Sequence, residues 1–192
     1  MAKKESTFIN MVATLFFVTL FSSAALGYVY ELTKGPKAAT DLAKKLNAIK
    51  EVVPEFTNNP DEEKFTVNAD GQPLIFYPAK KDGQLVATAI ETYSNQGFSG
   101  QIKLMVGLLP DGTIYKVKVI EHKETPGLGD KIEKKKSNFS QQFNEKDPSV
   151  FRLEVKKDGG DVDAITAATF SSRAFCDAVQ RAYKAYENKE RL

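Results

Sequence analysis

The pattern of apolar and polar positions begins with a segment long enough to cross a membrane. The 25 residues 6–30 carry no charge and centre on an apolar run at residues 11–21. A helix of that length spans about 37 Å, more than the ~30 Å hydrocarbon core of a bilayer. We therefore expect a transmembrane anchor at residues 6–30, preceded by a cytoplasmic stub of residues 1–5.

A soluble core helix and a cleavable signal peptide are the alternatives. The signal peptide is considered because Lys3 and Lys4 make a basic start and small residues follow at 22–25. The apolar stretch exceeds the roughly 7–15 residues of a signal-peptide core, which favours an uncleaved anchor. Lysines beyond the span outnumber those before it, but long domains translocate largely regardless of charge. We expect the N-terminus in the cytoplasm, the span in the inner membrane and the domain on the periplasmic or extracytoplasmic side.

A linker helix is predicted next. Apolar residues recur at intervals of four, three and four from Leu42 to Val53, which places them on one helical face, and Pro54 ends the pattern. We assign residues 31–57 to this linker and residues 58–192 to a folded domain.

The first half of that domain has the alternation typical of strands. The clearest strands are predicted at residues 86–93 and 102–109, separated by a flexible hairpin loop. A hairpin turn at residues 109–113 leads into a returning strand at 113–121. These segments predict an antiparallel sheet.

The second half turns helical. Ile132, Lys136, Phe139 and Phe143 form one stripe and predict a charged helix from residue 130. Residues 150–155 predict another strand. A final helix over residues 168–188 carries apolar residues at helical spacing and should pack on the sheet. The fold class is therefore α+β, with one N-terminal transmembrane helix and a single domain of mainly antiparallel sheet and packed helices.

Composition removes several functional classes. The chain has 27 Lys and Arg against 25 Asp and Glu, so its net charge of +2 provides no basic surface of the kind that binds nucleic acid. One cysteine cannot form an internal disulfide, and one cysteine with one histidine cannot build a tetrahedral zinc site without several carboxylates in support. Cys176 falls on the final helix, where a buried thiol is expected.

The start of the final helix is a candidate anion site. A glycine-led loop at 159–160 precedes it, and four hydroxyls cluster there, from Thr166, Thr169, Ser171 and Ser172. The first turn of a helix has unpaired N–H groups and the positive end of the macrodipole, which suit a phosphate. The alternative is an ordinary helix start capped by Asp163 or Thr166. The segment matches neither a Walker loop nor the Gly-x-Gly-x-x-Gly dinucleotide motif.

A second candidate is the loop at residues 121–130. Pro126, Gly127 and Gly129 predict a tight turn, in which the glycines permit a positive φ or the close approach of a ligand to the backbone. The alternative is an ordinary loop without a ligand. The single imidazole, His122, lies here without a neighbouring serine or cysteine nucleophile, so a catalytic triad has little support.

These motifs in this order resemble the FMN-binding domain of the G subunit of the Rnf electron-transport complex. The resemblance rests on residues 97–107, on Glu-Thr-Pro-Gly-Leu-Gly at 124–129 and on Asp-Ala-Ile-Thr-Ala-Ala-Thr at 163–169. A similar domain occurs in the C subunit of the sodium-pumping NADH:quinone oxidoreductase. The length of the chain is closer to the Rnf subunit.

The resemblance implies a covalent FMN. In that family a flavin transferase attaches the FMN phosphate to a threonine, which maps to Thr169. Asp163, Thr166 and Ala168 match the transferase recognition positions, while Ala167 replaces the usual glycine. A tether of this kind would place the remaining phosphate charge at the helix start.

By the same resemblance, the loop at 124–129 contacts the isoalloxazine ring. Polar contacts would come from Glu124 and Thr125 and apolar contact from Leu128, and Gly127 and Gly129 would let the ring approach. The flavin would supply the redox chemistry, so no catalytic acid or base is implied.

The resemblance thus implies an electron-transfer subunit of a membrane-bound, ion-translocating complex, an electron carrier within ferredoxin:NAD⁺ oxidoreductase and not a complete enzyme. Its partners would be the other Rnf subunits and the flavin transferase. Three alternatives remain at this point: the corresponding subunit of the quinone-reducing complex, a tethered flavoprotein outside any pump, and a domain that binds a soluble ligand without flavin.

Overall fold

The computed structural model describes residues 7–69 and 72–190, so the predicted stub at residues 1–5 lies outside the described residues. The chain divides into two compact units, residues 1–43 and 44–192. Three-10 turns are written η. The elements are α1 (Phe8–Val52), β1 (Phe65–Ala69), β2 (Gln72–Lys81), β3 (Gln84–Gly97), β4 (Gly100–Leu108), β5 (Ile114–Glu121), η1 (Gly129–Ile132), η2 (Phe139–Phe143), η3 (Lys156–Asp158) and α2 (Thr169–Glu190).

The first unit consists of the greater part of α1, which is long and apolar enough to cross a membrane. Its large apolar side chains are exposed within the unit. The hydroxyls of Thr14 and Thr19 donate to the carbonyls of Asn10 and Leu15 at 2.7 and 2.9 Å, so these polar groups are satisfied inside the helix itself. Pro36 lies within α1, so the sequence around it continues the helix and does not begin a new one.

The second unit is built on one antiparallel sheet with the strand order β1-β2-β3-β4-β5. Each strand pairs with the one before it in the chain, and Val106 of β4 lies between Ile90 of β3 and Val117 of β5. The order confirms the predicted antiparallel sheet and the α+β class. Because β3 and β4 are central, their middle residues are buried on both faces.

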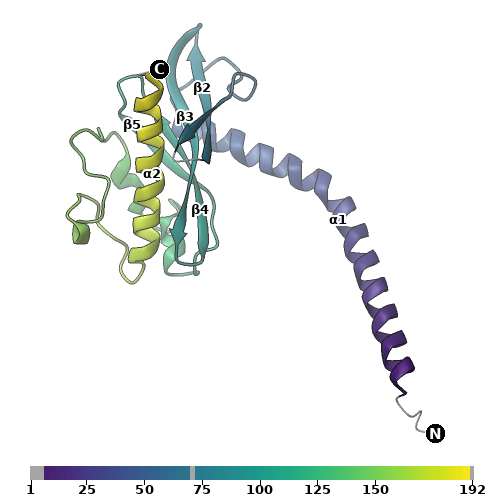
Figure 1. Cartoon of the computed structure of the whole chain (residues 1–192). Coiled ribbons are helices and arrows are strands. Elements are labelled where there is room, and N and C mark those ends of the chain that lie inside the picture. The colour runs from purple at the N-terminus through teal and green to yellow at the C-terminus, as the bar shows by residue number, and fades with distance from the viewer. Residues whose placement is uncertain (1–6, 70–71, 191–192) are drawn as a thin grey trace. The chain divides into compact units, whose positions relative to one another are not determined.

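One face of the sheet is covered by α2, which lies along the strands in Figure 1. The hydroxyl of Thr92 on β3 donates to the carbonyl of Ala178 at 2.9 Å and fixes the helix to the sheet. Phe175 of α2 packs on Phe143 with ring centroids 4.9 Å apart. Cys176 is buried on this helix as expected, and desolvation raises the pKa of its thiol to about 12.

The other face of the sheet is covered by the last turns of α1. Ala48, Ile49 and Val52 are buried there against β2, β3 and β4. A side chain at Gly107 would place its Cβ 1.7 Å from the carbonyl oxygen of Val52, so glycine is required for this close approach. The compact unit therefore starts at Lys44, before the start predicted at residue 58.

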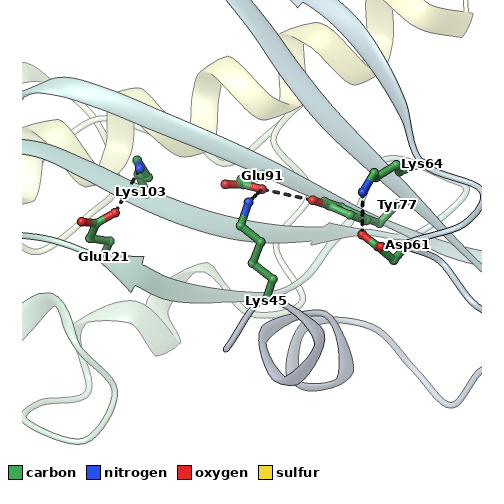
Figure 2. A network of polar contacts seen from close by, with 7 residues as sticks. All are labelled: Lys45, Asp61, Lys64, Tyr77, Glu91, Lys103 and Glu121. Atoms are coloured by element: carbon green, nitrogen blue, oxygen red, sulfur yellow. Dashed lines mark hydrogen bonds and ion pairs between the residues drawn. The ribbon is translucent and has the colours of Figure 1, made fainter. Parts of the chain in front are cut away.

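A polar network holds the same helix end on the sheet (Figure 2). Lys45 Nζ lies 3.0 Å from Glu91 Oε2, and the Tyr77 hydroxyl donates to the same carboxylate oxygen at 3.1 Å. Burial, together with the Glu91 charge, raises the pKa of Tyr77 above its usual value. The phenol therefore remains a hydrogen-bond donor.

The helix predicted from residue 130 is wrong, because that region contains only the short turns η1 and η2. Ser137 interrupts the pattern: its hydroxyl donates to the carbonyl of Lys131 at 2.6 Å and accepts from the N–H of Phe139 at 3.1 Å. Such local bonds compete with the helix ladder. The apolar stripe reflects burial, since Phe139 and Phe143 both belong to the core.

The strand predicted at residues 150–155 is also wrong. Among the described residues only an isolated bridge from Val155 to Val162 forms there. Aspartate side chains take backbone donors that a strand would use, as when the N–H of Arg152 donates to Asp161 Oδ2 at 2.8 Å. The loop expected at 93–102 is mostly strand, because β3 extends to Gly97 and β4 begins at Gly100.

Candidate functional site

Three segments that are distant in sequence meet at Glu124. Its carboxylate accepts a hydrogen bond from the N–H of Ser99 in the β3–β4 turn, at 3.0 Å, and another from the hydroxyl of Ser171 on α2. Glu124 is only 5% exposed. A Cβ at Gly129 would lie 2.6 Å from Glu124 Oε2 and 2.5 Å from Ser171 Oγ. The loop at 121–130 is therefore packed directly against the helix start and the turn.

His122 fixes the same loop from its other end. Its Nδ1 accepts the backbone N–H of Glu124 at 3.0 Å, so the ring proton resides on Nε2. Nε2 lies 2.7 Å from Glu133 Oε1 and donates to it. Both ring nitrogens of His122 thus make hydrogen bonds that hold the loop.

Asp130 closes the loop. Its side chain is nearly fully buried, and Oδ2 lies 2.6 Å from Lys136 Nζ. The hydrogen bond from Lys136 lowers the pKa of Asp130, with a smaller contribution from the backbone of Gly127. The aspartate is therefore ionised, and it anchors the turn that presents Thr125 and Leu128.

At the start of α2 the four predicted hydroxyls separate into two pairs. Ser171 bonds Glu124, and Ser172 Oγ accepts from the N–H of Ile165 at 2.9 Å and donates to the carbonyl of Ala168 at 3.0 Å. Thr166 and Thr169 make no side-chain hydrogen bond within the described part of the chain. Only these two hydroxyls are available to a ligand.

Neither Asp163 nor Thr166 caps the start of α2 in the structure. The first helical residue is Thr169, and Asp163 Oδ1 lies 2.7 Å from Lys156 Nζ instead. Within residues 7–69 and 72–190 no side chain of either residue bonds the N–H groups of the first turn. Those donors, at the positive end of the helix dipole, suit an anion.

Ala167, which stands where the resemblance implies glycine, has a φ of +62°. This is the left-handed region that glycine adopts without strain and that costs other residues about 1–2 kcal/mol. The turn before Thr169 therefore has a conformation suited to glycine, even though the residue is alanine.

Two exposed aromatic side chains, Phe170 next to Thr169 in the chain and Phe98 in contact with Phe170, were not predicted as site residues. Phe98, at the tip of the β3–β4 turn, is 70% exposed, and Phe170, the residue after Thr169, is 60% exposed. Their ring centroids are 6.4 Å apart. Leu128 on the loop is 43% exposed. The signal available in the sequence is the aromatic residue directly after Thr169, at a position where an exposed helix start is usually polar.

This arrangement fits a phosphate ester joined to a flat, apolar group. Free N–H donors and a free hydroxyl lie at Thr169, and an exposed apolar rim of Phe98, Phe170 and Leu128 lies on the segments that meet at Glu124. An FMN combines these two chemical parts, an anionic phosphate and a flat ring system. Bound FMN would supply electron transfer, while the protein would hold it in place.

Comparison with known proteins agrees with this assignment. Residues 97–184 match the model of the FMN-binding domain. The chain is 38% identical over 190 residues to the G subunit of the ion-translocating oxidoreductase complex of Haemophilus influenzae, covering 92% of this chain and 88% of the relative. It is 38% identical over 172 residues to the protein of the same name from Shewanella amazonensis, covering 84% and 80%.

A solved structure has the same fold. The crystal structure of the C subunit of Na⁺-translocating NADH-quinone reductase from Parabacteroides distasonis superposes with a TM-score of 0.52 at 22% identity, covering 76% of this chain and 81% of that chain. The identity to the Haemophilus and Shewanella proteins, over most of each chain, shows the family. The chain belongs to the family of the G subunit of the ion-translocating oxidoreductase complex, and it contains that family's FMN-binding domain.

Proposed function

We propose that this protein is an electron-transfer subunit of a membrane-bound, ion-translocating redox complex of the Rnf type, and that it carries electrons through an FMN. The observation that supports this most directly is the start of α2, where Thr169 has a free hydroxyl beside free N–H donors and the exposed ring of Phe170. The names of its relatives support the assignment to the G subunit of such a complex.

The FMN is held covalently through its phosphate on Thr169 Oγ1, and a flavin transferase makes the link. Ser171 and Ser172 are excluded as acceptors because both hydroxyls are buried and bonded inside the protein. Thr166 is exposed in the preceding turn and lies within the segment that the transferase would recognise. The N–H groups of the first turn stabilise the phosphate charge.

The neighbouring segments hold the flavin ring and shield it from water. Leu128, Phe98 and Phe170 contribute apolar surface, Thr125 is exposed in the loop, and the space around Gly127 is open to the ligand. Glu124 acts as a positioning residue, because its hydrogen bonds to Ser99 and Ser171 hold turn, loop and helix together. The protein needs no general acid or base to act as an electron carrier.

Co-expression with a flavin transferase tests the attachment. Intact mass and fragmentation should find one FMN less one water on Thr169. Thr169→Ala should remove the modification while the protein stays folded, and Thr169→Ser should retain it because the hydroxyl remains. An unmodified wild-type mass beside an active transferase, or in-gel flavin fluorescence that survives in Thr169→Ala, would contradict the assignment.

We further propose that the FMN domain faces the extracytoplasmic side, with α1 as an uncleaved anchor. The exposed Lys184 on α2 offers a site for a reporter, because Lys184→Cys adds a surface thiol while Cys176 is buried. In cells with a permeable outer membrane, a membrane-impermeant maleimide should label this thiol without lysis. Labelling only after lysis would place the domain in the cytoplasm.

A further inference from the structure

A groove of about 900 Å³ runs along β5, outside the candidate flavin site. β5 is the last strand of the sheet, so one of its edges pairs with β4 and the other has no strand beside it among the residues that the structure describes. Seven consecutive residues, 116–122, line the groove. Side chains of a strand alternate between its two faces, so an unbroken run of this kind indicates that the groove follows the outer edge of the strand.

The backbone along this edge is largely unpaired. Ile114 uses both of its groups, donating to the carbonyl of Lys146 at 2.9 Å and accepting from the N–H of Glu145 at 2.7 Å. From residue 115 to residue 120, no other backbone hydrogen bond joins the outer edge to any segment that the structure describes. An open edge of this length is a template for a further strand.

The acidic side chains that line the groove all have partners, whereas several of the lysines there form no ion pair within the described residues. Each carboxylate already has a partner: Glu51 pairs with Lys118, Glu133 accepts from His122, and Glu121 lies 3.0 Å from Lys103, the last pair being visible in Figure 2. Three lysines that line the groove make no ion pair within the described residues, namely Lys116, Lys134 and Lys135, and of these Lys116 places its Nζ 4.6 Å from the centroid of the Tyr115 ring. The groove therefore favours an anionic occupant.

We propose that an acidic, extended segment of another polypeptide binds in this groove and adds as a strand to the outer edge of β5. A lipid phosphate would use the lysines and leave the backbone edge unpaired, and a second copy of this chain would bring like charges together. Only an acidic strand satisfies both the open edge and the unpaired lysines. Val119 and Ile120, half-buried in the groove, provide apolar contact between these two polar features.

This docking site adjoins the flavin site through His122. The imidazole lines the groove, and its Nδ1 accepts the N–H of Glu124 in the loop at 121–130. A strand bound on β5 would thus lie beside the loop that presents Leu128. The proposal does not depend on flavin attachment, because every residue of the groove is part of the protein itself.

The test uses the full-length protein in detergent, without flavin, and a fluorescein-labelled octapeptide of alternating Glu and Val. Fluorescence anisotropy should show binding that weakens as salt rises. The same peptide N-methylated throughout cannot pair with a strand, so its affinity should be at least tenfold lower. Amide hydrogen exchange at residues 115–121 should slow when the unmodified peptide binds and should not change with the methylated one.

Variants separate the groove from the rest of the surface. The double substitution Lys134→Glu with Lys135→Glu changes exposed side chains and should weaken peptide binding at least tenfold. The matched control, Lys157→Glu with Lys184→Glu, changes exposed lysines outside the groove and should leave the affinity unchanged. Circular dichroism checks that both variants are folded.

Four results would overturn the proposal. Absence of binding, or equal binding of the methylated peptide, would exclude strand addition. Binding of vesicles containing phosphatidylglycerol that is lost in the groove variant and displaces the peptide, with no protection of residues 115–121, would identify a phosphate site instead. Sedimentation that shows a dimer lost in the same variant would identify a contact between copies of this chain.

Discussion

Glu124 shows how one buried carboxylate can organise a site without a cation. Its two oxygens accept from a backbone N–H and a hydroxyl, which replace the water lost on burial. Gly129 is required there for space, since a Cβ would meet Ser171 and Glu124, whereas Gly127 has a φ of +80° and is required for its conformation. Glycine is thus required at these two positions of one motif for two different physical reasons.

Ala167 leads to a prediction at the same scale. Its left-handed φ costs about 1–2 kcal/mol, and the greater freedom of glycine in the unfolded chain costs roughly 0.5–1 kcal/mol. Ala167→Gly should therefore raise the free energy of unfolding by about 0.5–1 kcal/mol in a urea titration. Ala167→Val, which adds a β-branch at the same φ, should lower it. A clear loss of stability in Ala167→Gly would show that the backbone of this turn is not strained.

At the scale of elements, the sequence predicts what depends on regular spacing and fails where side chains bond the local backbone. The strands at 86–93, 102–109 and 113–121 and the final helix are confirmed, because alternation and helical spacing there reflect burial on defined faces. The helix from residue 130 and the strand at 150–155 fail because Ser137 and Asp161 take backbone groups. Hydrogen bonds of this kind leave no periodic pattern in the sequence.

For the candidate site, the sequence pointed to the segments but not to their contacts. The loop and the helix start lie together because Glu124 bonds Ser99, which is 25 positions away in the chain, and Ser171, which is 47 positions away. The order of the motifs in the sequence could not show this contact. The exposed pair of Phe98 and Phe170 depends on a hairpin turn and a helix meeting in space. Contacts over such sequence separations follow from the fold and not from local pattern.

The turn segment after β5 gives a prediction about pH. The hydrogen bond from Lys136 lowers the pKa of Asp130, and Asp130 in turn raises the pKa of Lys136. The pair therefore stabilises the fold fully above the unfolded aspartate pKa of about 3.9 and below the unfolded lysine pKa of about 10.4. Lys136→Met should lower the urea midpoint at pH 7.

The difference between Lys136→Met and the wild type should shrink as the pH falls below about 4, because the folded-state pKa of Asp130 is then approached and its charge is lost. Lys135→Met, at the adjacent exposed position without an ion pair, serves as the control and should match the wild type at both pH 7 and pH 3. An equal difference at the two pH values would mean that Lys136 acts through packing and not through charge.

At the scale of the whole molecule, α1 belongs to both compact units, and its role differs between its first part and its last turns. Its residues up to 43 form the unit that is apolar enough to span a membrane, and the following turns use Ala48, Ile49 and Val52 to complete a core. Because the same unit, residues 44–192, contains both the candidate flavin site and the β5 groove, the folded domain can be tested apart from the membrane segment.

Two truncations test where that domain begins. Residues 44–192 should fold as a soluble protein, whereas residues 58–192 lack Ile49, Val52 and Val53 and expose the face of the sheet that they cover. Burying each such side chain contributes roughly 1.5–3 kcal/mol, so the sum over the three, of the order of 4.5–9 kcal/mol, is comparable to the total stability of about 5–15 kcal/mol. The shorter form should aggregate or melt without cooperativity in size-exclusion and circular dichroism experiments.

In the longer form Ile49→Ala should lower the free energy of unfolding by about 2–5 kcal/mol. Equal melting temperatures for the two truncations, or a negligible effect of Ile49→Ala, would show that the end of α1 is a linker and not part of the domain.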